Sequence, residues 1–147
     1  IYSSPVIATP SENPVHFNDA SNIGRTGLSY PSRIVMKASY HTPCTIQFFY
    51  RSGSGGIIQG PEYGNPYDYC KTEIFELEPK ERIIRVEVCT GTYQERANQN
   101  IIHHIKFITS IGREAQYGLC NNPNTKVSQE YKGFICPILV GLPRINF

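Results

Sequence analysis

Apolar and polar residues alternate with a period of two along several stretches of the chain. In RIIRVEV (82–88), one face carries Ile84, Val86 and Val88, and the other carries Arg85 and Glu87. TIQFFYR (45–51) alternates in the same way. NIIHHIKFITS (100–110) is expected to place Ile101, Ile105 and Phe107 on one face and Ile102, Lys106 and Ile108 on the other. This period is typical of strands that bury one face, so the pattern predicts β-strands.

Clusters of turn-forming residues separate these stretches: SGSGG (52–56), GPEYGNPYD (60–68) and GLCNNPN (118–124). The 11 prolines and 12 glycines leave little room for a helix of three turns, and no helical stripe of apolar residues is present. The sequence therefore predicts an all-β fold of short antiparallel strands.

The length and charge of the chain limit its class. A chain of 147 residues is expected to form one domain with its own apolar core. Its 14 basic and 12 acidic residues are scattered, which argues against nucleic acid as a partner. The longest apolar run, ICPILVGL (135–142), is too short to cross a bilayer, so we expect no membrane insertion.

The five cysteines predict disulfides rather than a metal site. They are Cys44, Cys70, Cys89, Cys120 and Cys136, and no C-x-x-C motif occurs. Two disulfides can be drawn among five cysteines in 5 × 3 = 15 ways, and the sequence does not choose among them. The odd cysteine is either free or joined to another chain. Cys44 and Cys120, in predicted loops, are expected to be more accessible than Cys136.

Catalytic motifs are missing from the sequence. His103 and His104 are adjacent and would point to opposite faces of a strand, so they cannot chelate one metal together. The acidic residues are dispersed on charged stretches such as FELEPKER (75–82), where a solvated face is expected. A glycosidase pair assembled from distant carboxylates stays open, but we expect no enzyme and no cofactor.

The stretch IIHHIKFITSIGREAQYGLCNNPN (101–124) resembles the jacalin-related lectins. That family has a Leu-x-Phe-x-Thr strand followed by a short strand that closes on Tyr-Gly; the matching positions here are Ile105, Phe107, Thr109, Tyr117 and Gly118. Upstream, SRIVMKAS (32–39), TIQFFY (45–50), TEIFELE (72–78) and RIIRVEV are similar to the family's strand order. KGFICPILVG (132–141) resembles its C-terminal strand. The resemblance covers residues 15–141, and within the family the cysteines are most similar to secreted molluscan lectins.

The resemblance implies a β-prism, in which three four-stranded antiparallel Greek-key sheets surround a pseudo-threefold axis. Residues 1–147 would then form one jacalin-like lectin domain with an N-terminal extension over 1–14. Each sheet would present two loops at one end, a Gly-x-x-x-Asp loop and a glycine-containing loop, which together hold a sugar. A fixed carboxylate can accept bonds from neighbouring sugar hydroxyls, and glycine leaves the loop amides uncovered.

Two loop pairs of this chain match that arrangement. In the first, Gly91, Thr92, Tyr93, Gln94 and Glu95 would form the carboxylate loop, and Tyr117, Gly118 and Asn122 the partner loop. Glu95 departs from the family's Asp by one methylene. In the second, GNPYD (64–68) supplies Gly64, Tyr67 and Asp68 and would pair with SYHTPC (39–44). Both pairs are candidate carbohydrate-binding sites.

The family's principal site is altered in this chain. NIGRTG (22–27) would have to pair with a C-terminal Gly-x-x-x-Asp, but Gly141 is followed at the fourth place by Ile145. We expect the last strand to be shortened or absent, and the N-terminal segment IYSSPVIATP (1–10) to cover the gap in its own chain or in a neighbour's.

The sequence thus predicts a secreted lectin that binds neutral mono- or disaccharides weakly and acts as a homodimer or larger assembly, with a disulfide link between chains as one option. The chain begins with IYSSPV rather than with Met, as a mature secreted product or a trimmed chain would. The alternative is a structural protein of an extracellular matrix, shell or mucus that uses the same fold without binding sugar.

Overall fold

The computed structural model describes residues 28–93, 96–120 and 125–132, which form eight β-strands and no helix. The strands are β1 (Leu28–Ala38), β2 (Pro43–Ser52), β3 (Ile57–Gly64), β4 (Lys71–Glu76), β5 (Ile83–Tyr93), β6 (Arg96–Thr109), β7 (Glu114–Gly118) and β8 (Thr125–Lys132). These residues therefore include no helix that could span a membrane. The prediction of an all-β fold is confirmed.

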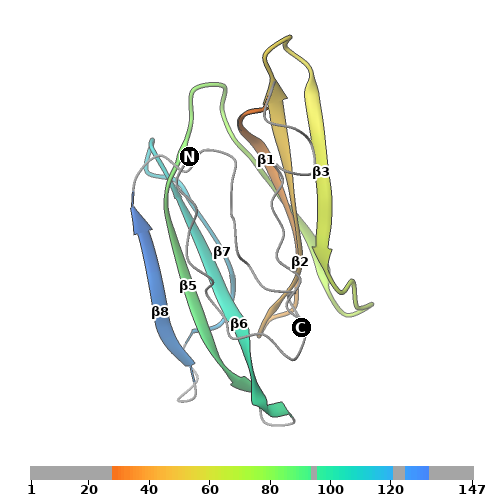
Figure 1. Ribbon diagram of the computed structural model, residues 1–147, viewed down its shortest axis with the longest axis vertical. Coiled ribbons are helices and arrows are strands. Elements are labelled where there is room, and N and C mark those ends of the chain that lie inside the picture. Colours follow the sequence, from red (N-terminus) through yellow and green to blue (C-terminus); the bar gives the residue numbers. More distant parts are fainter. Residues whose placement is uncertain (1–27, 94–95, 121–124, 133–147) are drawn as a thin grey trace.

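The strands form two four-stranded antiparallel sheets that lie side by side (Figure 1). Sheet A has the order β3-β2-β1-β4, and sheet B has the order β7-β6-β5-β8. Each order is a Greek key, because the fourth strand returns to pair with the first. NIGRTG (22–27), expected at the family's altered principal site, and residues 133–141 of the stretch that resembles the family's C-terminal strand lie outside the described residues.

The antiparallel pairing places connections at two ends of the molecule. Segments 39–42, 65–70 and 119–120 lie at one end, which we call the loop end. Segments 53–56, 77–82 and 110–113 lie at the other, which we call the linker end because 77–82 joins the two sheets there.

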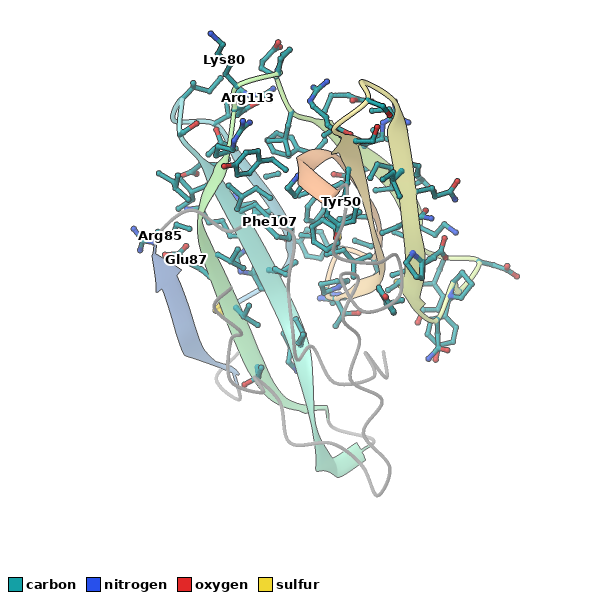
Figure 2. The ribbon with its side chains drawn as sticks, turned by 45° about the horizontal axis from the view of Figure 1, so that its top comes forward. Tyr50, Lys80, Arg85, Glu87, Phe107 and Arg113 are labelled. Carbon is teal, nitrogen blue, oxygen red and sulfur yellow. A yellow bond between two sulfur atoms is a disulfide. The ribbon has the colours of Figure 1, made fainter. Side chains whose placement is uncertain are left out.

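The main core lies between the two sheets. Its buried side chains come from alternate strand positions: Ile34, Met36, Ile46, Phe48 and Tyr50 from sheet A, and Val86, Val88, Ile102, Ile105, Phe107 and Tyr117 from sheet B. Figure 2 shows Tyr50 and Phe107 in the space between the sheets, and Arg85 and Glu87 on the far side of β5. The rings of Phe48 and Phe107 meet edge to face at 6.2 Å between centroids. Period-two alternation thus selects the buried face of β2 and of β5 from Val86 onward. At the start of β5 the register shifts between Ile83 and Arg85, so Ile83 is buried and Ile84, predicted on the face of Val86 and Val88, is only half-buried.

A β-bulge in β6 overturns one predicted face. Cys89 pairs with His104 but Thr90 pairs with Ile102, so His103 is an extra residue on β6. The extra residue reverses the alternation, and Ile102 is buried in the core with Ile105 instead of opposite it. The prediction that Ile102 lies on the outer face with Lys106 is therefore wrong.

The segment 77–82 is fixed to sheet B by a buried carboxylate. The side chain of Glu81 has no exposed surface and forms an ion pair with Arg113. Burial raises the pKa of Glu81, but hydrogen bonds from Arg113, the Thr109 hydroxyl and the Glu78 backbone N–H outweigh it and lower the pKa to about 2. The expectation of a solvated face over FELEPKER is wrong for Glu81. Its side chain is buried because Arg113, from the turn between β6 and β7, supplies the opposite charge.

Two disulfides join segments within this chain, Cys44 to Cys70 and Cys89 to Cys120. Cys44 and Cys120 each have an intrachain partner, so neither is the odd cysteine that would be joined to a second chain. The predicted difference in accessibility between these two cysteines and Cys136 stays a prediction. Cys44 and Cys89 are also buried. Cys136 belongs to neither pair and lies outside the described residues.

Candidate functional site

The loop end brings together segments from both sheets. The backbone N–H of Leu119 donates to the carbonyl of His103 at 3.1 Å and to that of His41 at 3.3 Å. The first bond stays within sheet B, whereas the second reaches the β1–β2 loop of sheet A. The two predicted loop pairs are therefore neighbours across the sheet boundary.

The β3–β4 loop (65–70) is fastened at both ends to one residue, Cys44. At its start, the N–H of Asn65 donates to the carbonyl of Cys44 at 3.1 Å; at its end, Cys70 forms a disulfide with Cys44. Gly64 makes the close approach feasible. Its φ is +114°, and a Cβ there would lie 2.1 Å from the Cys44 carbonyl oxygen. Only glycine fits this position without displacing β2.

The β1–β2 loop (39–42) is held by the side chain of Ser39. The backbone N–H of Ser39 donates to the carbonyl of Thr42 at 2.9 Å. The hydroxyl oxygen of Ser39 accepts from the N–H groups of Thr42 (3.1 Å) and His41 (3.3 Å). This is the local side-chain-to-backbone bonding that serine favours in turns. It fixes the position of Tyr40 and His41 beside the neighbouring loop.

Exposed aromatic rings gather on these two loops. Tyr67 and Tyr69 stack with ring centroids 5.3 Å apart and planes inclined by 5°, and Tyr69 is 65% exposed. Tyr40 is 77% exposed and meets the ring of His41 edge-on. Asp68 lies between the stacked tyrosines in sequence and is exposed. Flat apolar faces and a carboxylate on a fastened loop suit a small ligand with both C–H faces and hydroxyls.

The carboxylate loop predicted at 91–95 is shorter than expected. Gly91 is buried within β5 and pairs with Ile101 and Thr125 on its two sides, and the strand continues through Thr92 to Tyr93. Strand pairing therefore extends three residues into the stretch predicted as a loop. Gln94, Glu95 and Asn122 lie outside the described residues.

Tyr117 and Gly118 end β7 beside the β1–β2 loop. The ring of Tyr117 is buried between the sheets, and burial together with the charge of Glu73 raises its pKa to about 12. The ring thus packs in the core rather than facing a ligand. Gly118 has a φ of +84°, and a Cβ there would lie 1.9 Å from the carbonyl oxygen of His103. It repeats the role of Gly64.

One relation between the loop pairs was not predicted. β3 and β7 both end in Tyr-Gly, at Tyr63-Gly64 and Tyr117-Gly118. In each case the glycine has positive φ, and the next residue donates its N–H to the adjacent strand. The repeated dipeptide is a signal in the sequence that these two strand ends are equivalent.

The two described Greek-key sheets, with their loops brought together at one end, correspond to two of the three faces of a lectin-type β-prism. A family model described as "Jacalin-like lectin domain" matches residues 14–139, and the chain therefore belongs to that family. No curated protein sequence matches the chain significantly.

Solved lectin structures show the same fold. Artocarpin, described as a lectin with mannose specificity, superposes with a TM-score of 0.65 at 17% identity, over 90% of this chain and 84% of its own. AcmJRL from Ananas comosus, a mannose-binding jacalin-related lectin, gives 0.63 at 16%, over 86% and 77%. A galactose-specific lectin from Artocarpus hirsuta gives 0.61 at 15%, over 80% and 79%. The closer resemblance to molluscan lectins stays a prediction.

Proposed function

We propose that this protein is a secreted carbohydrate-binding lectin whose main described site is the loop pair 39–44 and 64–70. The observation that carries the proposal is the exposed ring of Tyr69, stacked on the half-buried Tyr67, together with the exposed Asp68, on a loop fastened at both ends to Cys44. Membership of the jacalin-like lectin domain family and the sugar-binding structural neighbours support it.

A pyranose has complementary chemistry for this surface. The exposed ring of Tyr69 can pack against the C–H face of the sugar, which excludes water from both. The carboxylate of Asp68 can accept hydrogen bonds from two neighbouring hydroxyls, and charge-assisted bonds of this kind are the stronger ones. Because the loop is held by Cys44, little order has to be gained when the sugar binds.

Single sites of this kind are weak. About four hydrogen bonds at roughly 0.5–1.5 kcal/mol each, less the cost of ordering the groups that form them, suggest dissociation constants near millimolar. Useful avidity then requires several sites in one particle, and we propose that the protein acts as a homodimer or a larger assembly. The two disulfides support a secreted, oxidised form.

The second loop pair is proposed as a further site on the same end. Its described part is the end of β7 with Gly118 and Leu119, which contacts the β1–β2 loop. Thr92, Tyr93, Gln94, Glu95 and Asn122 would complete it.

Retention on immobilised mannose and galactose, followed by a glycan array, tests the proposal. Asp68→Asn and Tyr69→Ala are each expected to reduce retention, and the double variant Asp68→Asn with Glu95→Gln to abolish it. Glu78→Gln and Ile111→Ala are matched controls, because both residues are exposed at the linker end. The controls are expected to bind as the unchanged protein does.

Retention that survives the double variant would remove both loop pairs as sites. Absence of binding by the unchanged protein to every glycan tested would instead favour the extracellular structural role. Sedimentation of the native protein checks the assembly, since a single species of 16.6 kDa would contradict a dimer.

A further inference from the structure

Three potential metal ligands converge on sheet B near the loop end. They are Cys89 on β5, His104 on β6 and Cys120 just after β7. Their ligand atoms all lie within 4.8 Å of one another, and no other group of three such residues occurs in the described part of the chain. In the structure the two sulfurs are joined as a disulfide.

The histidine is held in the form that binds a metal. Its Nε2 lies 3.3 Å from Oε1 of Gln116. An amide oxygen can only accept, so Nε2 carries the proton and Nδ1 keeps a free lone pair. That Nδ1 atom is buried and has no hydrogen-bond partner among the described residues. Metal-binding histidines are commonly fixed by such a bond from the other ring nitrogen.

Two irregularities of strand pairing meet at Cys89. On the β6 side the register shifts between Cys89 and Thr90, and on the β8 side between Val88 and Cys89. Bulges re-aim side chains and are frequent beside functional sites. Cys89 is directly paired with His104 across β5 and β6, so strand pairing holds two of the three ligand residues side by side.

We propose that opening the Cys89–Cys120 disulfide creates a site for one thiophilic divalent cation, with zinc as the probe. A phosphine reductant opens it by taking up oxygen from water: the phosphorus is oxidised to the phosphine oxide, the S–S bond breaks, and two thiols form with the two protons. Zinc then displaces both thiol protons to solvent and takes the Nδ1 lone pair, which leaves its fourth position open to water. The proposal does not depend on carbohydrate binding.

The geometry permits this change. Tetrahedral zinc with bonds of about 2.3 Å to sulfur and about 2.0–2.1 Å to nitrogen separates its ligand atoms by roughly 3.5–3.8 Å. The three ligand atoms already lie within 4.8 Å. The sulfurs must move apart, and Cys120 follows the end of β7, outside any strand, so its side chain can turn away without unpairing a strand.

The other disulfide is an internal control. Cys44 and Cys70 are joined in the same way but belong to no group of three ligands among the described residues. A protein in which zinc binds to any reduced cysteine would use both pairs. The proposed site uses only the pair beside His104.

The test is titration of the phosphine-reduced protein with zinc and with cobalt(II), whose absorption spectrum reports thiolate ligands and tetrahedral geometry. All variants carry Cys136→Ser, so that the fifth thiol cannot act as a ligand. One equivalent of metal is expected in this background and in Cys44→Ser with Cys70→Ser. Cys89→Ser with Cys120→Ser is expected to bind none, and oxidised protein none. His104→Ala is expected to weaken binding roughly 10-fold or more, and Gln116→Ala less.

Three outcomes would overturn the proposal: no metal bound after reduction, equal affinity in His104→Ala, or binding that is lost with Cys44 and Cys70 instead. Circular dichroism accompanies every titration. Where reduction unfolds the chain, zinc is expected to restore the β-sheet signal in the background protein at a concentration roughly 10-fold or more lower than His104→Ala requires, and failure to restore it in the background protein also overturns the proposal.

Discussion

Sheet A and sheet B repeat the same backbone hydrogen bonds at two places, the turn at the linker end and the Tyr-Gly strand end at the loop end. At the linker end, Ser52 N–H donates to the Gly56 carbonyl at 2.8 Å, and Thr109 N–H donates to the Arg113 carbonyl at 2.9 Å. The hydroxyls of Ser52 and Thr109 each accept the N–H four residues later. Gly55 and Gly112 take positive φ at equivalent places. Gly64 and Gly118 do so at the loop end.

The side chains at these equivalent places differ. Gly56 in sheet A corresponds to Arg113 in sheet B, and only Arg113 reaches the buried Glu81 of the linker. The disulfides are also placed differently. Cys44 is the second residue of β2, whereas Cys89 lies in the middle of β5, the strand that corresponds to β1.

The comparison separates two kinds of requirement. Turn geometry demands particular backbone conformations, so glycine and a hydroxyl-bearing residue recur wherever the fold repeats. Salt bridges and disulfides join residues that are far apart in sequence, and they lie at different places in the two sheets. Substitutions can test this distinction. Changes at equivalent turn positions should lower the free energy of unfolding equally in both sheets, whereas changes at contacts found in one sheet should not.

The largest effects are expected from the disulfides. Replacing Cys44 and Cys70 by alanine, or Cys89 and Cys120, should each cost roughly 3–4 kcal/mol, because the closed loops span similar separations of 26 and 31 residues. Urea unfolding without reductant measures both. If replacing either pair left the free energy of unfolding unchanged, the disulfide would not stabilise the protein by restricting its unfolded chain, and the prediction would be wrong.

Glu81→Gln should destabilise sheet B's linker contact by about 2–3 kcal/mol, since charge-assisted bonds from Arg113 and Thr109 are lost from a buried site. Glu76→Gln is the matched control in sheet A. Its ion pair with Arg33 is exposed and should contribute less than about 1 kcal/mol. Equal effects of the two variants in urea unfolding would contradict the distinction.

The same carboxylate predicts a pH dependence. The pKa of Glu81 is about 2 when folded, compared with its ordinary value of 4.5, so its stabilising contribution is fully present above pH 4.5 and is lost as the pH falls towards 2. In Glu81→Gln this part of the pH dependence should disappear. Thermal unfolding across that interval measures it, and an unchanged slope in the variant would assign the acid sensitivity to other groups.

Gly64→Ala and Gly118→Ala should cost similar amounts, about 2 kcal/mol each, because each places a Cβ against a strand carbonyl at positive φ. Gly53→Ala, where an added Cβ meets nothing within 4 Å, is the control and should be nearly neutral. Thermal unfolding compares the three. A tolerated alanine at only one of the two sites would break the equivalence of β3 and β7.

The smallest effects are expected on the outer faces. Lys37→Gln removes one ion pair with Glu62, and Lys106→Gln removes two, with Glu87 and Glu114. Each should cost less than about 1 kcal/mol, with the larger loss at Lys106, and both losses should shrink in high salt. Unfolding at two salt concentrations checks this. A loss that is independent of salt would point to packing of the lysine stems instead.

Local pattern was sufficient for the central strands and insufficient elsewhere. The buried faces of β2 and most of β5 follow from alternation, and SGSGG does form the β2–β3 turn. β3 was missed because its Gly60, Pro61 and Gly64 favour a turn, and as an edge strand it buries little. Nothing local marks the bulge at His103.

The candidate site also has features that the sequence predicts and features that it does not. GNPYD was identified as a tyrosine-rich loop, and the structure places it beside SYHTPC, as the resemblance implied. The pairing of the cysteines and the Glu81–Arg113 contact depend on residues brought together by the fold. Their partners are 26 to 32 residues away in sequence, beyond the reach of any local period.

The double attachment of the β3–β4 loop to Cys44 has an evolutionary consequence. A hydrogen bond at Asn65 and a disulfide at Cys70 close the segment into a ring on a single residue of β2. The residues inside the ring, Pro66 to Tyr69, can therefore be exchanged while the frame that carries them stays in register. Diversification of this stretch, by natural drift or in a randomised library, would alter what the surface recognises and leave the sheets beneath it unchanged.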